Sequence, residues 1–176
     1  MCIRDRVLVG GGIANTFLKA AGFEVGISLV EDEMIDISRK LLETNKIILP
    51  KNVYVANSTQ DNSAELVPVQ DVNKNKMILD IELSEEMRSI SNHNYIIWNG
   101  PLGIFEIEQF SNGTKQLINF LENSSSKVIA GGGETIYAIS KFSDIKKFNY
   151  VSTAGGAFLE YLSGYRLPSI EALRLK

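Results

Sequence analysis

The sequence contains few of the residues on which several common kinds of site depend. Among its 176 residues there is one cysteine, Cys2, which excludes an internal disulfide and a cysteine-based metal cage. The one histidine, His93, excludes metal sites built on a histidine pair and argues against a Ser-His-Asp enzyme. No apolar run approaches the roughly 18–20 residues that a membrane helix requires. The sequence therefore predicts no membrane partner.

The charge balance excludes a further class of protein. The chain carries 18 Lys and Arg against 21 Asp and Glu, a formal net charge of −3. General nucleic-acid binders concentrate basic residues to meet the phosphates, so we expect no nucleic-acid partner. The composition, with 44% apolar and 22% charged residues, is typical of a globular domain. No signal-peptide pattern is visible, and we expect a cytoplasmic protein.

Four apolar, strand-like runs are each followed by glycine and then by a segment of helical periodicity. They are residues 7–9, 95–98, 127–130 and 150–153. This order is typical of an α/β domain whose parallel sheet is covered by helices on both faces. The run 95–98 is continuously apolar, so we expect a strand buried on both faces. Residues 57–76 are polar and irregular, and we expect a surface excursion there with at most a small strand.

Residues 1–6 fit poorly with the strand that follows them. They are charged, contain the cysteine and run into the apolar segment 7–9 without a turn or cap. We interpret residues 1–6 as a doubtful leader, with a frayed native strand as the alternative, and we base the expected fold on residues 7–176.

Glycines gather directly after the predicted strands, in segments 10–15, 99–106, 131–135 and 152–157. In parallel sheets, ligands bind beyond the carboxyl ends of the strands. Helix N-termini at these ends offer free N–H groups and the positive end of the helix dipole, which suit phosphate, and glycine lets a ligand approach the backbone. One such loop is usually only a turn, but four in one short chain favour a ligand that carries phosphate.

Two familiar nucleotide-binding motifs are absent. No Gly-x-x-x-x-Gly-Lys-Ser/Thr segment occurs, which excludes a P-loop protein. Asn15 stands where the dinucleotide fingerprint after Gly10 requires glycine, and the acidic residues about 20 positions later begin a helix instead of ending a strand. NAD binding is therefore disfavoured.

The loop sequences resemble those of one family. Trp98–Glu106, WNGPLGIFE, closely resembles a signature of phosphoglycerate kinase. Gly10–Lys19, Gly131–Thr135 and Ser152–Glu160 resemble further segments of that family, in the same order and at similar spacing. The resemblance runs from Val7 to the C-terminus.

The resemblance implies a Rossmann-like three-layer α/β domain, with a parallel sheet that is incomplete here. Residues 7–176 would form the nucleotide-binding C-terminal lobe of a glycolytic kinase, which uses Mg²⁺ to transfer a phosphoryl group between 1,3-bisphosphoglycerate and ADP, giving 3-phosphoglycerate and ATP. An N-terminal lobe would hold the phosphoglycerate, and the full enzyme would be a monomer. Because this reaction depends on positioning and charge stabilisation, we expect the chain alone to be inactive. The alternative is a non-catalytic module that binds adenine nucleotides.

By the resemblance, the segment after the third strand meets the phosphates and the metal. Glu134 stands where the family usually has aspartate and would bind Mg²⁺ through a hard carboxylate oxygen. Gly132, Gly133 and Thr135 would meet phosphate oxygens through N–H groups and a hydroxyl. From the residues alone, a carboxylate that favours the helix dipole is the preferred explanation of Glu134, and simple capping is the alternative for Thr135.

The resemblance assigns the adenosine part to residues of the second loop. Glu106 would hydrogen-bond the ribose hydroxyls, with a solvated loop carboxylate as the alternative. Asn99, Pro101 and Gly103 would form the wall of the pocket. An amide that holds the loop is the equal alternative for Asn99, because an amide buried without partners is costly.

The remaining assignments concern both ends of the nucleotide. Gly11 and Gly12 would lie against the adenine, and Leu79 belongs to a segment that resembles the family's adenine side, with core packing as its alternative. Gly155 and Gly156 are the candidate catalytic residues, because they open a helix whose N–H groups could receive the phosphoryl group in transfer.

This sequence departs from the family in three places. Ala154 replaces a glycine, which adds a Cβ beside the transferring phosphate. Glu82 and Leu83 stand where Gly-Pro is usual. Residues 1–6 contain no match to the family's phosphate-neutralising lysines.

Overall fold

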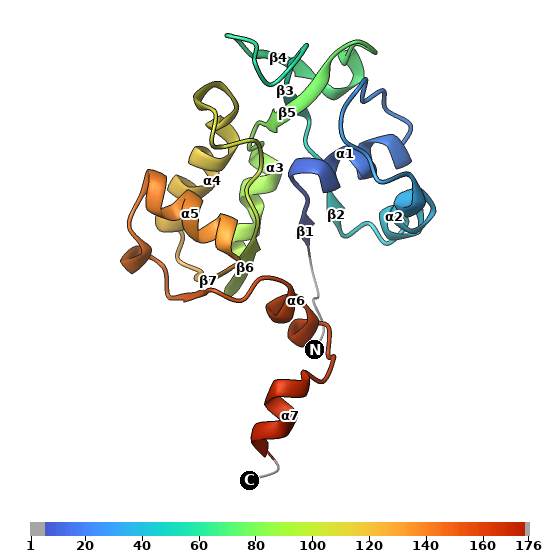
Figure 1. The fold of residues 1–176 in the computed structure, drawn as a ribbon. Coiled ribbons are helices and arrows are strands. Elements are labelled where there is room, and N and C mark those ends of the chain that lie inside the picture. Colours follow the sequence, from blue (N-terminus) through green and yellow to red (C-terminus); the bar gives the residue numbers. More distant parts are fainter. Residues whose placement is uncertain (1–5, 175–176) are drawn as a thin grey trace.

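The computed structural model describes residues 6–174, so the proposed leader lies outside the described residues except for Arg6 (Figure 1). The strands are β1 (Val7–Leu8), β2 (Ile47–Ile48), β3 (Asn52–Ala56), β4 (Glu65–Pro68), β5 (Met77–Ile81), β6 (Tyr95–Asn99), β7 (Lys127–Gly131) and β8 (Tyr150–Ser152). The α-helices are α1 (Gly11–Ala20), α2 (Ile35–Leu42), α3 (Glu85–Arg88), α4 (Asn112–Glu122), α5 (Gly133–Phe142), α6 (Gly156–Leu162) and α7 (Pro168–Arg174). Within the described residues, 3₁₀ segments lie at Asp32–Met34, Val69–Asp71, Ser89–Asn92, Glu108–Phe110 and Ile145–Lys147.

The described strands form three sheets. β1 and β2 pair in parallel. β6, β7 and β8 form a second parallel sheet, with β7 in the centre. β3 lies between β4 and β5 and is antiparallel to both. The predicted α/β class with parallel strands is confirmed, but two parallel sheets and an antiparallel one replace the single sheet that the sequence suggested.

Strand β6 corrects the prediction of a strand buried on both faces. Ile96 and Trp98 are 8% and 5% exposed, whereas Tyr95 and Ile97 are 60% and 41% exposed. Helices α4 and α5 lie beside one face of this sheet (Figure 1). The other face, to which Tyr150 on β8 also contributes an exposed ring, remains open in the described part of the chain. A continuous apolar run therefore does not establish that both faces are covered.

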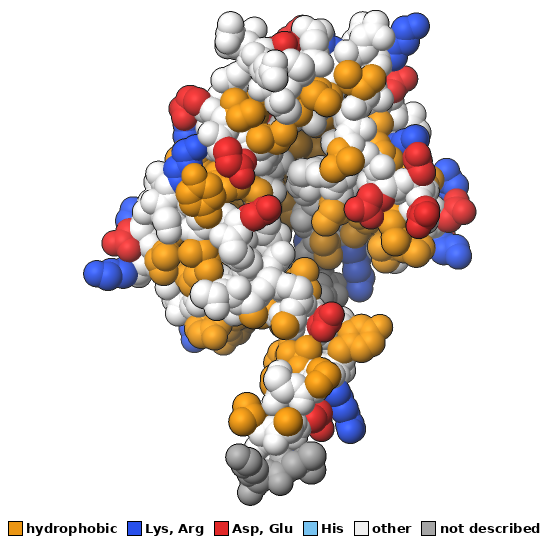
Figure 2. Space-filling model, viewed as in Figure 1, with side chains coloured by type: hydrophobic (Ala, Val, Ile, Leu, Met, Phe, Trp, Pro, Cys, Tyr) orange, Lys and Arg blue, Asp and Glu red, His pale blue; other side chains and the backbone are white. Residues whose placement is uncertain are grey.

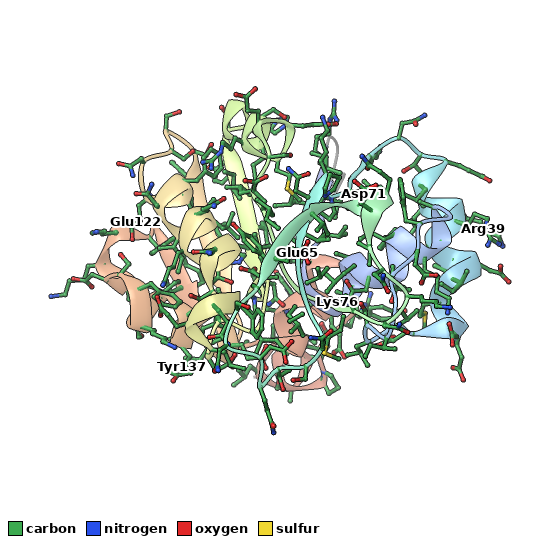
Figure 3. All side chains as sticks on the ribbon, turned by 90° about the horizontal axis from the view of Figure 1, so that it is seen from above. Arg39, Glu65, Asp71, Lys76, Glu122 and Tyr137 are labelled. Atoms are coloured by element: carbon green, nitrogen blue, oxygen red, sulfur yellow. The ribbon has the colours of Figure 1, made fainter. Side chains whose placement is uncertain are left out.

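The antiparallel sheet differs most from the sequence expectation. β4 is the small strand expected within residues 57–76, but β5 has no counterpart among the predicted strands. Asp80 interrupts its apolar pattern, although the side chain is only 1% exposed. Seen from above, Glu65 of β4 lies between Arg39 of α2 and Glu122 of α4 (Figure 3).

Helix α1 begins directly after β1, as the glycine pattern predicts. Gly10 is extended, and Gly11 has φ +56°, a left-handed conformation that favours glycine. Ala14, Phe17 and Leu18 bury one face of the helix. The helix ends before Gly22, whose φ of +92° again favours glycine. This start places the glycines of segment 10–15 at the end of a strand.

One core joins the three sheets. Its buried side chains include Leu18 of α1, Val53 of β3, Ile96 of β6 and Val128 of β7. The C-terminal helices are different, because α6 and α7 have no buried residue, and α7 extends away from the body (Figures 1 and 2). No helix among residues 6–174 has the length and apolar character needed to cross a membrane.

Two neighbouring residues of β6 test its one-sided burial. Ile96→Ala should lower the free energy of unfolding by about 2–4 kcal/mol, because it opens a cavity in the core. Ile97→Ala removes the same atoms from the open face and should cost less than about 1 kcal/mol. Urea unfolding of the two variants measures both effects. Equal losses would show that both faces of β6 are covered.

Candidate functional site

The glycine-rich loops meet at one edge of the molecule. They follow β1, β6, β7 and β8, and we call them loop A (residues 10–12), loop B (99–106), loop C (131–135) and loop D (152–157). All four leave the carboxyl ends of parallel strands, the place where parallel sheets bind ligands.

Loops A and B are joined through their backbones. The N–H of Gly11 donates to the carbonyl of Leu102 at 2.9 Å. A Cβ at Gly10 would lie 2.5 Å from a methyl group of Leu102 and 3.1 Å from its Cα, so the absence of a side chain at Gly10 favours this close approach. The two loops come from different sheets, and this contact connects the half that carries α1 with the half that carries α4 and α5. The surface is hollowed between these halves in Figure 2.

Loops B and C are joined by two side chains. The Asn99 amide donates to the carbonyl of Gly131 at 2.9 Å, and the Thr135 hydroxyl accepts from the N–H of Gly100 at 2.7 Å. Gly100 and Gly132 have φ of +93° and +98°, which side chains other than glycine rarely adopt. Asn99 and Thr135 therefore hold these loops together. This is the structural alternative proposed for Asn99, whereas the Thr135 hydroxyl binds loop B and makes no capping hydrogen bond in α5.

Loop C is also in contact with loop D. The N–H of Gly132 donates to the carbonyl of Ser152 at 3.1 Å. A Cβ at Gly155 would lie 3.6 Å from the Cα of Gly132, and a Cβ at Gly131 would overlap the ring of Phe158. Gly132, Gly133 and Gly156 are all at least partly accessible, at the starts of α5 and α6. These helix starts offer their free N–H groups along one edge.

Two carboxylates extend from the same edge. Glu106 ends loop B and Glu134 lies in the first turn of α5, and both are exposed. The ammonium group of Lys141 donates to the carbonyls of Phe105 and Glu106, at 3.1 and 2.9 Å, and so holds the end of loop B against α5.

Within residues 6–174, no three His, Cys, Asp or Glu side chains lie together as a ready metal site. Mg²⁺ usually binds one or two protein carboxylates and takes its other ligands from phosphates and water. A single exposed carboxylate beside the N–H groups of a helix start fits that habit, so the position of Glu134 suits a metal that arrives with a phosphate-bearing ligand.

Leu79 and Asp80 lie behind loop B on β5. Leu79 is 6% exposed and packs with Phe110 and Ile104, as the core alternative predicts, and its carbonyl accepts from the N–H of Ile104 at 2.9 Å. Burial raises the pKa of the Asp80 carboxyl from 3.8 to about 7, although N–H groups, Gly113 first among them, and the charge of Lys115 act in the opposite direction.

The sequence alone did not identify Leu29 as part of this edge. Its side chain is 76% exposed, and its methyl carbon lies 3.4 Å from the place of a Cβ on Gly12. The Asn15 amide donates to the carbonyl of Leu29 at 3.3 Å, and the Thr16 hydroxyl accepts from the N–H of Glu31 at 3.1 Å. The segment is therefore tied to α1 with an apolar side chain beside loop A. Because Leu29 is separated from loop A along the sequence, no local pattern predicted this contact.

Comparison with known proteins gives the same family. The family model described as phosphoglycerate kinase matches residues 1–165. The chain belongs to the phosphoglycerate kinase family. It is 43% identical over 185 residues to phosphoglycerate kinase of Psychrobacter sp., and 44% identical over 179 residues to that of Francisella philomiragia. Each alignment covers 97% of this chain and 46% of the relative, so the chain spans slightly less than half the length of these kinases.

Solved structures of the family share this fold. Phosphoglycerate kinase from Coxiella burnetii superposes with a TM-score of 0.87 at 41% identity, covering 98% of this chain and 47% of that one. The enzyme from Pyrococcus horikoshii superposes with a TM-score of 0.80 at 27% identity, covering 97% and 45%. The Rossmann-like α/β class is thereby confirmed for this member of the family.

The raised pKa of Asp80 predicts a pH dependence of stability. Its pKa is about 7 in the folded chain and about 3.9 when unfolded. The folded state therefore binds this proton more tightly, and the stability it contributes is present below the unfolded pKa and is lost as pH rises through about 7. The free energy of unfolding of the parent, measured relative to Asp80→Asn, should fall between about pH 4 and 7 and level off above that. Asp36→Asn, an exposed control, should track the parent, and a flat difference for Asp80→Asn would refute the raised pKa.

Proposed function

We propose that this chain forms the ADP and ATP site of a phosphoglycerate kinase. The observation that supports this best is the continuous connection of loops A to D, through Gly11, Asn99, Thr135 and Gly132, at the carboxyl ends of parallel strands. A nucleotide is long enough to need several such loops, with an apolar surface at one end and N–H groups at the other.

The adenosine would lie at loops A and B. Gly11 and Gly12 leave the backbone accessible to a flat ring, and Leu29 supplies an apolar side chain next to them. Pro101 and Gly103 form the adjoining wall, supported from behind by Leu79. Glu106 is exposed at the end of loop B, where it can accept hydrogen bonds from ribose hydroxyls.

The phosphates would lie at loops C and D. The N–H of Gly133 and the others at the start of α5 are suited to the phosphate oxygens. Gly132 would act mainly by letting the phosphates approach its backbone, because its N–H already donates to Ser152. Thr135 would act mainly through Gly100, because its hydroxyl is buried and already accepts that N–H. Mg²⁺ bound with the nucleotide would supply positive charge to the phosphates, and Glu134 is the residue that would hold it.

The whole protein would move a phosphoryl group from the acyl phosphate of 1,3-bisphosphoglycerate to a β-phosphate oxygen of ADP. One P–O bond to the carboxyl group breaks, one P–O bond to ADP forms, and 3-phosphoglycerate and ATP result. Gly155 and Gly156 would stabilise the transferring group through their N–H groups. The other part of the kinase would bind the phosphoglycerate, so this chain alone would not turn over. As in our sequence-based expectation, the enzyme would be monomeric and cytoplasmic.

The first experiment is a calorimetric titration of the chain with MgADP and with inorganic triphosphate. Glu106→Gln should weaken ADP binding by about 1–2 kcal/mol, the range of a charge-assisted hydrogen bond. Triphosphate, which has no ribose, should bind as it does to the parent. Glu65→Gln, on exposed β4, is the matched control. A parent that binds no ADP would refute the proposed function, whereas equal losses for both ligands would refute only the role of Glu106.

The second experiment concerns the metal. The parent should bind ADP more tightly with Mg²⁺ than with a chelator, and Glu134→Ala should bring the two affinities together. Glu134→Asp should retain most of the difference, because it keeps the carboxylate oxygens. An undiminished effect of Mg²⁺ in Glu134→Ala would assign the metal to the nucleotide alone.

A further inference from the structure

A buried carboxylate that the proposed chemistry does not use lies behind loop B. Asp80 is on β5, and its two oxygens point to different partners. One oxygen accepts from the N–H of Ile81 at 2.9 Å and the other from the N–H of Gly113 at 2.8 Å. Asn112, the first residue of α4, also donates its N–H to this carboxylate. The side chain therefore ties the start of α4 to strand β5.

Loop B closes around the same carboxylate. A Cβ at Gly103 would overlap the Asp80 oxygen, so the loop backbone packs directly on it. Next to this contact, the N–H of Ile104 donates to the carbonyl of Leu79, and the N–H of Leu102 donates to the hydroxyl of Thr114 on α4, at 3.1 Å. The middle of loop B thus rests on β5 and α4 at once, and Asp80 lies where the three segments meet.

An apolar or amide side chain of similar size would avoid the cost of a buried charge. Both oxygens of Asp80 face backbone N–H groups, however, and an asparagine would turn its NH₂ group toward one of these donors. The carboxylate is the side chain of this shape that accepts on both sides. Groups that cost stability and fix a local geometry are expected near functional sites.

We propose that Asp80 is a positioning residue of the nucleotide site, which fixes loop B against β5 and α4 so that Gly103 and Glu106 face the adenosine. The inference rests on the proposed function. Among loops A to D, Asp80 contacts loop B, at Gly103, and this is the segment that would bind the adenosine. Loop C, which would bind the phosphates, is joined to loop B at Asn99 and Gly100, before the contact with Asp80. Loss of the Asp80 carboxylate should therefore weaken binding of the adenosine end of the nucleotide and leave the phosphate end unaffected.

The test compares Asp80→Asn with Asp36→Asn, the same change at an exposed position on α2. We expect Asp80→Asn to weaken MgADP binding about 5-fold or more while inorganic triphosphate binds within about 2-fold of the parent, and Asp36→Asn to change neither. A variant that is merely less well folded would lose both ligands together. Unchanged ADP affinity, or equal loss of both ligands, would overturn the inference.

A second measurement uses the unchanged chain, in case Asp80→Asn does not fold. Saturating MgADP should slow amide hydrogen exchange at Ile81 and Gly113 more than at Arg39 in α2, although neither of the first two lies in the proposed site. Equal slowing at all three would overturn the inference. A parent that binds no ADP would instead show that the proposed function itself is wrong, and the role of Asp80 would fall with it.

Discussion

Loop B can meet its neighbours only because two of its glycines accept geometries that other residues do not. Gly100 has a φ of +93°, and its N–H reaches Thr135 of α5. Gly103 lacks the Cβ that would overlap Asp80. Between them, Leu102 joins loop A through its carbonyl and α4 through its N–H. The relative placement of loops A and C depends on this one backbone segment.

This dependence explains why the site uses so few charged side chains. Loops A to D are joined to one another by backbone N–H and carbonyl groups and by the uncharged side chains of Asn99 and Thr135. The carboxylates Glu106 and Glu134 remain exposed at the edge, free to meet a ligand. Asp80, the one deeply buried carboxylate of the described residues, lies behind the loops. A phosphate-bearing ligand would thus meet N–H groups first, with the carboxylates suited to its sugar and its metal.

The sequence predicted the elements whose signals are local. Val7–Leu8, Lys127–Gly131 and Gly133–Phe142 follow the expected order of strand, glycine and helix, and each pattern lies within a few residues. β5 was missed because Asp80 interrupts its apolar run. The open face of β6 was missed because a strand's own sequence does not say which helices cover it.

The same distinction applies to the site. The glycines of loops A to D directly follow apolar runs in the sequence, and from this order we predicted that they lie at the ends of parallel strands. The position of Leu29 beside Gly12, and that of Asp80 beside Gly103 and Gly113, depend on contacts between residues far apart in the sequence. No local sequence pattern predicts such contacts. The resemblance to phosphoglycerate kinase supplied the roles of Glu106 and Glu134, which their exposed positions permit.

The claim that loops A to D form one nucleotide site can be tested directly. Amide resonances of the chain should be followed by NMR during titration with MgADP. We expect Gly11, Gly103, Gly132 and Gly156, one from each loop, to shift along a common binding curve, while Leu66 of β4 remains unchanged. Shifts confined to one loop, or different apparent affinities for different loops, would contradict a single site built from all four.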